Sequence, residues 1–256
     1  MGIIDTHSHI YLEQFDDDRD EMIRRAFEAG LEKILMPNID VESIKAMMDL
    51  HDKYPENCIP MMGLHPTSVG EGYQKQLDEM FGQLQKHRFC AIGEIGIDLY
   101  WDKTYLSQQL EAFRIQLNWA KEFELPVVIH ARDAFDEIFQ VLDGMDMQGI
   151  TGVFHSFSGT EEHARKILDY QNFYLGINGV VTFKNSGLDK IVREIGYEKL
   201  LLETDAPYLT PTPFRGKRNE PAYINYVVQK LADIFEVSQT EIEDVTTANA
   251  RDLFNL

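Results

Sequence analysis

The sequence has little of what marks secreted or membrane proteins. Only two cysteines occur in 256 residues, Cys58 and Cys90, each inside an apolar run. We therefore expect buried thiols and neither a disulfide nor a cysteine metal site. The first residues show no basic segment followed by an apolar stretch, and no segment approaches the roughly 18 apolar residues of a membrane span. These absences predict a cytoplasmic protein without a membrane contact, and we expect no stable protein partner.

Basic residues are scarce as well. The chain has 24 Lys and Arg against 43 Asp and Glu, a formal net charge of −19. Such a charge repels polyanions at long range, whereas a protein that coats a nucleic acid backbone normally carries the opposite sign. Charge alone therefore argues against extended contact with DNA or RNA.

What the sequence does contain is a regular alternation. Short β-branched or aliphatic runs alternate with segments of helical period, as in a parallel sheet covered by helices. The eight runs are 2–5, 33–36, 58–63, 89–94, 127–130, 151–155, 173–177 and 200–203. An open doubly wound sheet more often stops at about five to seven strands. We therefore predict an α/β fold with one domain over residues 1–256, a (β/α)₈ TIM barrel. Two extra C-terminal helices, 222–235 and 238–254, are expected to cover its outside.

Ionisable residues follow these apolar runs. Barrel enzymes build their active sites where the strands end. A buried carboxylate or imidazole is costly unless it is paired or binds a metal, and residues two apart on an extended chain share a face. Taken alone, each residue has the alternative of a hydrogen-bonded buried side chain. Together they predict metal ligands: His7, His9, Glu94, His130, His155 and Asp205.

The predicted ligand set indicates an open catalytic site. It contains no cysteine, which disfavours a closed structural zinc site, and its imidazoles and carboxylates suit Mg²⁺, Mn²⁺ or Zn²⁺. Six ligands are too many for one ion that keeps a water, so we expect two divalent ions roughly 3.5–4 Å apart. Glu94 is expected to bridge them, and Asp205 to orient the attacking water or accept its proton. Glu203 is a further catalytic candidate, with a buried ion-pair partner as the alternative.

Several motifs together resemble the TatD family of metal-dependent deoxyribonucleases, within the amidohydrolase-type barrels. They are DTHSH at 5–9, GLHP at 63–66, IGEIGID at 92–98, HAR at 130–132, HSFSG at 155–159, ETDAPYLTP at 203–211 and FRGKRNEP at 214–221. By this resemblance, His7, His9, Glu94 and Asp205 would hold the first metal, and Glu94, His130 and His155 the second. The resemblance also implies hydrolysis of DNA phosphodiesters from the 3′ end with Mg²⁺ or Mn²⁺.

A further group of residues is expected to contact the substrate. An arginine fork matches a phosphate group, and exposed aromatic rings can stack on bases. The candidates are His65, Arg132, Arg215, Lys217 with the neighbouring Arg218, and Tyr100 with the neighbouring Trp101. The alternatives are a turn hydrogen bond for His65, a surface salt bridge for Arg132, and a cap on the barrel for the aromatic pair.

The negative charge restricts the kind of nuclease that we expect. A protein that grips a strand end through two metal ions and a few cations needs no basic groove. DNA strand ends or oligonucleotides are therefore the expected partners, with weak binding to long duplexes. Two alternatives stay open: a two-metal hydrolase of another small phosphoester, ester or amide, and a metal-stabilised scaffold without turnover.

Overall fold

The computed structural model describes residues 2–256, in which eight short strands alternate with helices. The strands are β1 (Ile3–Asp5), β2 (Leu31–Met36), β3 (Cys58–Pro60), β4 (Ile92–Asp98), β5 (Val127–Arg132), β6 (Gly152–Phe154), β7 (Phe173–Ile177) and β8 (Leu200–Leu202). The helices are α1 (Arg19–Glu28), α2 (Ser43–Lys53), α3 (Tyr73–Leu84), α4 (Leu106–Phe123), α5 (Phe135–Asp143), α6 (Glu161–Asp169), α7 (Leu188–Ile195), α8 (Ile224–Phe235) and α9 (Gln239–Phe254). Four 3₁₀ turns complete the order: η1 (Glu13–Phe15), η2 (Pro66–Ser68), η3 (Gly179–Thr182) and η4 (Pro221–Tyr223).

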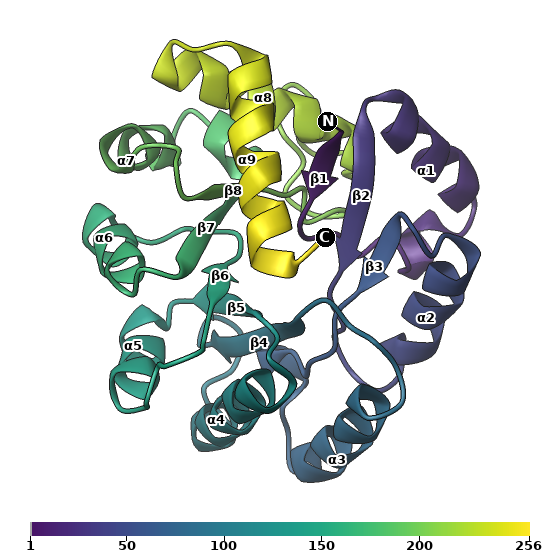
Figure 1. The fold of residues 1–256 in the computed structure, drawn as a ribbon, viewed down its shortest axis with the longest axis vertical. Coiled ribbons are helices and arrows are strands. Elements are labelled where there is room, and N and C mark those ends of the chain that lie inside the picture. Colours follow the sequence, from purple (N-terminus) through teal and green to yellow (C-terminus); the bar gives the residue numbers. More distant parts are fainter. Residues whose placement is uncertain (1) are drawn as a thin grey trace.

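All strand pairs are parallel, and they form one sheet of order β1-β2-β3 and another of order β4-β5-β6-β7-β8. Individual contacts join the two sheets: a bridge between Met62 and Ile92, and two 2.9 Å hydrogen bonds from the Thr6 amide and hydroxyl to the Leu202 carbonyl. Figure 1 shows the strands around a common centre, with α1 to α8 outside them. The predicted α/β barrel arrangement is confirmed.

Helix α9 occupies a different place from the one predicted. It crosses the strands (Figure 1), and Ala250, Leu253 and Phe254 pack against strand residues that point into the barrel, such as Ile4 and Leu201. The expectation that the last helix covers the outside is therefore wrong. Its apolar residues stabilise the barrel interior at the amino ends of the strands. The carboxyl ends of the strands remain for a site.

Strand β4 extends further than the apolar run predicted. The expected strand ended at Glu94, whereas the ladder with β5 continues to the pair of Asp98 with Arg132. Gly96 permits this pairing, because its φ is +138° and a Cβ there would overlap the carbonyl oxygen of His130. Glu94 is therefore the third residue of β4 and lies within the strand, and β4 ends on a second carboxylate, Asp98.

Candidate metal centre

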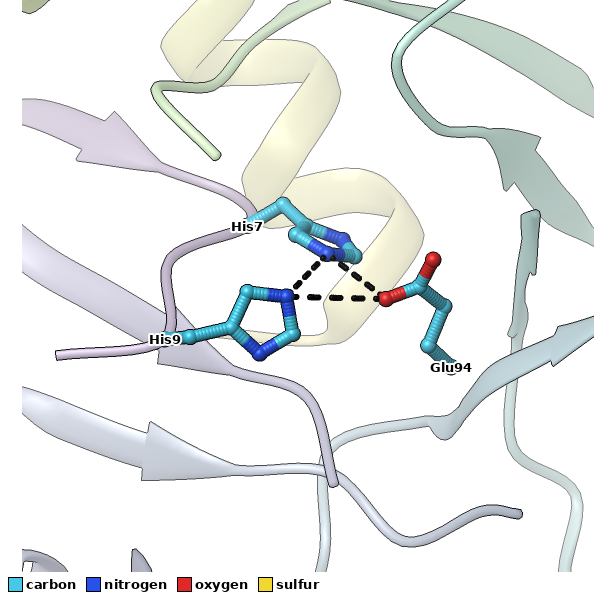
Figure 2. Close-up of side chains that lie close together, drawn as sticks. All are labelled: His7, His9 and Glu94. Carbon is cyan, nitrogen blue, oxygen red and sulfur yellow. Dashed lines mark hydrogen bonds and ion pairs between the residues drawn. The ribbon is translucent and has the colours of Figure 1, made fainter. Parts of the chain in front are cut away.

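Four side chains from three distant parts of the sequence converge in a first donor cluster. His7 Nε2 lies 3.3 Å from His9 Nε2 and 3.1 Å from Glu94 Oε2, and Figure 2 shows the two rings turned toward this carboxylate. Asp205 Oδ1 lies 3.8 Å from His7 Nε2 and 3.6 Å from His9 Nε2. Four ligands about 2.1 Å from one ion, at tetrahedral angles, would lie roughly 3.4 Å from one another. The spacing of this donor set fits one divalent cation.

The imidazoles of the first cluster are in the form that binds metals. Burial lowers the pKa of His7 to about 4 and that of His9 well below its usual value. The Tyr11 hydroxyl donates to the Pro37 carbonyl at 2.6 Å, so at 3.1 Å it can only accept from His9 Nδ1. The proton of His9 is therefore on Nδ1, and its Nε2 lone pair points into the cluster. Neutral imidazole is the protonation state that a metal requires.

Asp205 completes the first cluster, in surroundings that disfavour its negative charge unless a cation is bound. Its side chain is 13% exposed, against 5% or less for the other three members. Burial raises the pKa of Asp205 to about 8, and the charges of Glu94 and Glu203 add to the effect against the opposing influence of His155. A positive ion in the cluster would restore the carboxylate form.

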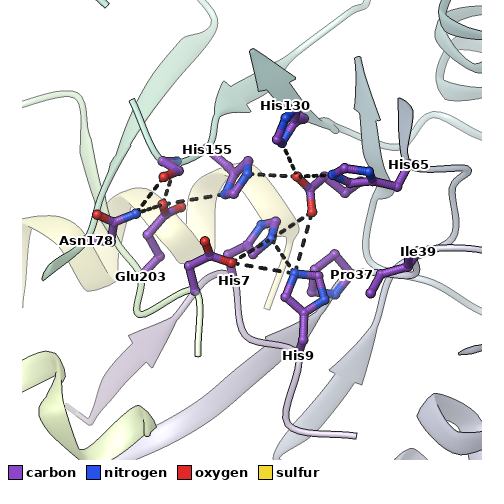
Figure 3. A network of polar contacts seen from close by, with 12 residues as sticks. His7, His9, Pro37, Ile39, His65, His130, His155, Asn178 and Glu203 are labelled. Carbon is purple, nitrogen blue, oxygen red and sulfur yellow. Dashed lines mark hydrogen bonds and ion pairs between the residues drawn. The ribbon is translucent and has the colours of Figure 1, made fainter. Parts of the chain in front are cut away.

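A second donor cluster forms around the other oxygen of Glu94. Glu94 Oε1 lies 2.7 Å from His130 Nδ1 and 2.8 Å from His155 Nε2. Figure 3 shows His130 and His155 within one network of polar contacts. Burial opposes ionisation of Glu94, but the nearby histidines, His155 first, hold its pKa well below the usual range. One carboxylate thus presents one oxygen to each cluster. This is the arrangement expected of a ligand that bridges two ions.

Asp98 is a residue of the site that the sequence analysis missed. Its Oδ2 lies 2.9 Å from His130 Nε2, while its Oδ1 accepts hydrogen bonds from the backbone amides of Tyr100 at 3.0 Å and Trp101 at 3.3 Å. A carboxylate that holds the outer nitrogen of a histidine leaves the inner nitrogen free for a metal. In an extended strand, Glu94, Gly96 and Asp98 lie on the same face. This spacing could have indicated from the sequence that Asp98 belongs to the site of Glu94.

His65 approaches the second cluster with its protonated ring nitrogen. Its Nε2 lies 3.3 Å from Glu94 Oε1, close enough for a ligand by distance alone. The backbone amide of Thr67, however, donates to His65 Nδ1 at 3.1 Å. Because an amide can only donate, the ring proton must be on Nε2. His65 therefore offers a donor to the site, and the turn hydrogen bond considered as an alternative is present as well.

Glu203 lies behind the histidines. Its Oε1 accepts from the Ser156 amide at 2.5 Å and lies 3.6 Å from His155 Nδ1 (Figure 3). Within residues 2–256, Glu203 Oε2 and the Nδ1 atoms of His7 and His155 are buried without a hydrogen-bond partner. Glu203 thus lies within 4.8 Å of a ring nitrogen of each of these histidines, but it forms no hydrogen bond with either Nδ1. Its direct catalytic role stays a prediction.

Comparison with known proteins agrees with this geometry. A family model described as TatD related DNase matches residues 4–255. The chain belongs to the TatD family. It is 40% identical to the uncharacterized metal-dependent hydrolase YabD of Bacillus subtilis, over 99% of each chain. It is 32% identical to the 3′-5′ ssDNA/RNA exonuclease TatD of Salmonella typhimurium, over 95% of each chain. The crystal structure of YjjV, a TatD homologue from Escherichia coli, superposes with a TM-score of 0.91 at 30% identity, covering 99% of this chain and 98% of that one.

Membership of the TatD family confirms the predicted class of enzyme. This chain is a metal-dependent hydrolase that acts on ester bonds. Within residues 2–256, no helix is long and apolar enough to cross a membrane. Both cysteines of this TatD protein are free and buried, as expected, and burial raises the pKa of each thiol to about 12.

The rim of the TatD site holds Arg132 and the loop after β4. The Arg132 guanidinium lies 3.8 Å from the centre of the Tyr100 ring and 5.4 Å from that of Trp101. Arg132 makes no ion pair within residues 2–256, so the salt bridge considered for it is absent there. Tyr100 and Trp101 are exposed rather than packed as a cap on the barrel.

The loop after β8 differs from the predicted basic patch at Arg218. Arg215 and Lys217 are exposed, and Arg215 lies over the Phe183 ring at 4.1 Å. Arg218 instead makes a two-pronged ion pair with Asp18, at 2.7 and 2.8 Å. Its guanidinium therefore holds the loop in place. The prediction that Arg218 is available to a phosphate group is wrong.

Asp98→Asn tests the tautomer of His130. Asparagine can still accept from the Tyr100 amide, but its NH₂ group would donate to His130 Nε2 and move the ring proton to Nδ1. We expect one of the two Mn²⁺ sites, the one that uses His130, to lose about 10- to 100-fold in affinity, as measured by isothermal titration calorimetry. Asp102→Asn, which changes a carboxylate that binds the Thr104 amide in the same loop, is the matched control. Unchanged Mn²⁺ binding by Asp98→Asn would contradict this tautomer.

Asp18→Asn tests the ion pair that holds the loop after β8. The hydrogen bond from Arg218 is the main cause that lowers the pKa of Asp18 to about 2. A depressed carboxyl pKa stabilises the fold above pH 4, and this stabilisation disappears as the pH falls toward 2. We expect Asp18→Asn to lower the free energy of unfolding by up to about 1 kcal/mol at pH 7. In urea unfolding, a difference from wild type that is as large at pH 3 as at pH 7 would argue against the ion pair.

Proposed function

We propose that this TatD protein is a metal-dependent exodeoxyribonuclease that removes nucleotides from the 3′ end of single-stranded DNA. The observation that carries the proposal is the Glu94 carboxylate, which presents one oxygen to each of two donor clusters. A site for two ions suits phosphodiester hydrolysis, where both the attacking and the leaving oxygen need stabilisation. The name of the Salmonella relative, a 3′-5′ ssDNA/RNA exonuclease, supports the choice of substrate.

The chain's own residues have distinct tasks in this reaction. Two divalent ions, Mg²⁺ or Mn²⁺ and with Zn²⁺ as a further option, would supply water activation and charge neutralisation. Asp205 is the most exposed member of the first cluster, and in this proposal it would accept the proton of a water that enters from the open end. His65 Nε2–H can donate to a phosphate oxygen, and Arg132 adds positive charge beside it.

The charge of the molecule favours a substrate held at its end. With a net charge of −19, long-range attraction to duplex DNA is absent. Arg215 and Lys217 are exposed on the loop after β8 and can contact phosphates beyond the scissile one. DNA ends or oligonucleotides are therefore the proposed partners. A cytoplasmic location and the absence of a stable protein partner stay predictions.

A labelled single-stranded oligonucleotide tests this function. With 5′-labelled DNA and Mg²⁺ or Mn²⁺, we expect a ladder of products that shortens from the 3′ end, and no products with EDTA. The matching duplex should be cleaved more slowly and should bind weakly in a metal-free gel-shift assay. Tight metal-free binding to internal duplex would contradict the proposed end specificity.

The same assay separates the alternatives. Equal cleavage of an RNA oligonucleotide would widen the substrate to single-stranded nucleic acid. Turnover of small phosphoesters, lactones or amides without cleavage of DNA would replace the nuclease by another two-metal hydrolase. If metal-loaded protein turns over none of these substrates, the remaining interpretation is a metal-stabilised scaffold.

A further inference from the structure

The exposed aromatic side chains of this protein gather beside the metal centre. In residues 2–256, four large apolar side chains are strongly exposed: Tyr100 at 54%, Trp101 at 70%, Tyr208 at 49% and Tyr226 at 38%. Three of them lie on two loops at the site: Tyr100 and Trp101 follow β4, the strand that carries Glu94, and Tyr208 lies on the loop after β8, which carries Asp205. Only Tyr226 lies elsewhere, on α8. Exposed rings of this size at a catalytic rim point to a flat ligand.

The first aromatic wall adjoins the second donor cluster. Asp98 holds the backbone amides of Tyr100 and Trp101 with one oxygen and His130 with the other, so this wall has a fixed relation to the cluster. Trp101 also lines a hollow of about 240 Å³, together with residues 66–70 of the loop after β3. Pockets for drug-sized ligands usually measure about 300–1,000 Å³. The hollow therefore suits a single ring system rather than a whole nucleotide.

The second aromatic wall adjoins the first donor cluster. The Tyr208 ring lies 6.3 Å from the His9 ring, centre to centre, at an interplanar angle of 67°. Its backbone is fixed, because the Tyr208 amide donates to the Asp205 carbonyl at 2.8 Å and the Tyr208 carbonyl accepts from Asn219 at 2.6 Å. Tyr208 nevertheless remains 49% exposed to solvent.

The two walls lie at opposite ends of the metal centre. His9, beside Tyr208, faces Glu94 Oε2, whereas His130, tied to the other wall through Asp98, faces Glu94 Oε1. We propose that Tyr208 and the Tyr100–Trp101 pair stack on the two bases that flank the scissile phosphate, one on each side. This inference rests on the proposed nuclease function and adds a requirement for bases in the substrate.

Stacking suits a protein of this charge. A base is uncharged, so its binding does not suffer from the net charge of −19 that disfavours backbone contacts. Every base has a flat π-face, and stacking is therefore tolerant of sequence. The Arg132 guanidinium lies against the Tyr100 ring on this wall and adds a cation that favours both bases and phosphates.

Abasic substrates test the two walls. Three single-stranded oligonucleotides are compared with Mn²⁺: an intact one, one with a tetrahydrofuran residue in place of the 3′-terminal nucleoside, and one with this residue in the penultimate position. We expect wild-type kcat/KM for release of the terminal residue to fall roughly 10- to 100-fold for each abasic oligonucleotide. Trp101→Ala and Tyr208→Ala should each raise KM for the intact strand by a similar factor. Each variant should also lose the preference for an intact base over an abasic residue at one of the two positions.

Three controls accompany the test with abasic substrates. Tyr226→Ala removes the exposed ring away from the centre and should leave kcat and KM unchanged. Trp101→Phe and Tyr208→Phe keep a stacking ring and should restore the preference for bases. Mn²⁺ binding by the alanine variants, measured by calorimetry, shows that the metal centre is intact.

The outcomes distinguish this inference from the proposed function. If wild-type protein does not cleave the intact strand, the nuclease function fails. If it cleaves intact and abasic strands equally well, the function stands and the base requirement is overturned. Discrimination that survives both alanine substitutions would also overturn it, because other residues would then recognise the bases.

Discussion

Replacing Glu94 by glutamine is expected to remove both metal ions and to lower DNA cleavage by at least about 10³-fold. The reason is geometric: each oxygen of this carboxylate faces a different donor cluster, so one substitution weakens both. Each ion is expected to supply several kcal/mol of charge stabilisation, and each 1.4 kcal/mol corresponds to a factor of ten in rate. Metal content by elemental analysis after dialysis, together with the cleavage rate, measures the effect.

A second buried glutamate provides the control for Glu94→Gln. Glu220 is 8% exposed and pairs with Arg25 at 2.7 Å, away from both clusters. Glu220→Gln should lower stability and leave the metal content as in wild type. A Glu94→Gln variant that still retains two ions would show that this carboxylate does not bridge them.

Asp205→Asn is expected to lower kcat by about 10²- to 10⁴-fold, the usual contribution of a positioned proton acceptor. The fold should persist, since Asp205 is a rim residue and is partly exposed. The second cluster does not use Asp205, so the variant should retain one ion with near wild-type affinity. Full activity of Asp205→Asn would refute its role as proton acceptor.

The metal-free forms give a readout for Asp205 that does not depend on activity. The pKa of Asp205 is raised to about 8 in the fold, from an unfolded value of 3.8. A raised carboxyl pKa stabilises the fold at low pH, and this stabilisation is lost as the pH rises from about 4 through 8. Wild-type protein without metal should therefore lose stability over this range relative to Asp205→Asn. Parallel stability curves in EDTA would contradict the burial of this carboxyl group.

Much of the metal centre was predictable because its ligands follow apolar runs. A histidine or carboxylate after several aliphatic residues is expensive to bury, and this cost makes His130, His155 and Asp205 conspicuous in the sequence. The structure brings all six predicted ligands together. The position of Glu94 within β4, rather than at its end, was not predictable from the run 89–94. Residues 89–91 are buried like strand residues, but they lie outside the β4 ladder.

Contacts between distant residues were beyond the sequence. The pair of Arg218 with Asp18 spans 200 positions, so nothing local distinguished this arginine from Lys217. The tautomer of His65 depends on the amide of Thr67 in a turn whose geometry the sequence does not specify. The position of α9 depends on the interior of the barrel, since its apolar face would fit either the outside or one end.

The position of α9 also bears on how this protein forms. Thr247 of α9 donates to the carbonyl of Gly2, directly before β1, at 3.5 Å, and Asn249 donates to the carbonyl of Leu200 in β8 at 2.9 Å. Apolar residues of α9 also pack against Ile4 of β1. The helix thus contacts both β1 and β8, the first and last strands made during synthesis. The first metal cluster needs His7 and Asp205 as well. A growing chain therefore has no complete first cluster until Asp205 has been added, and the barrel floor closes only after that.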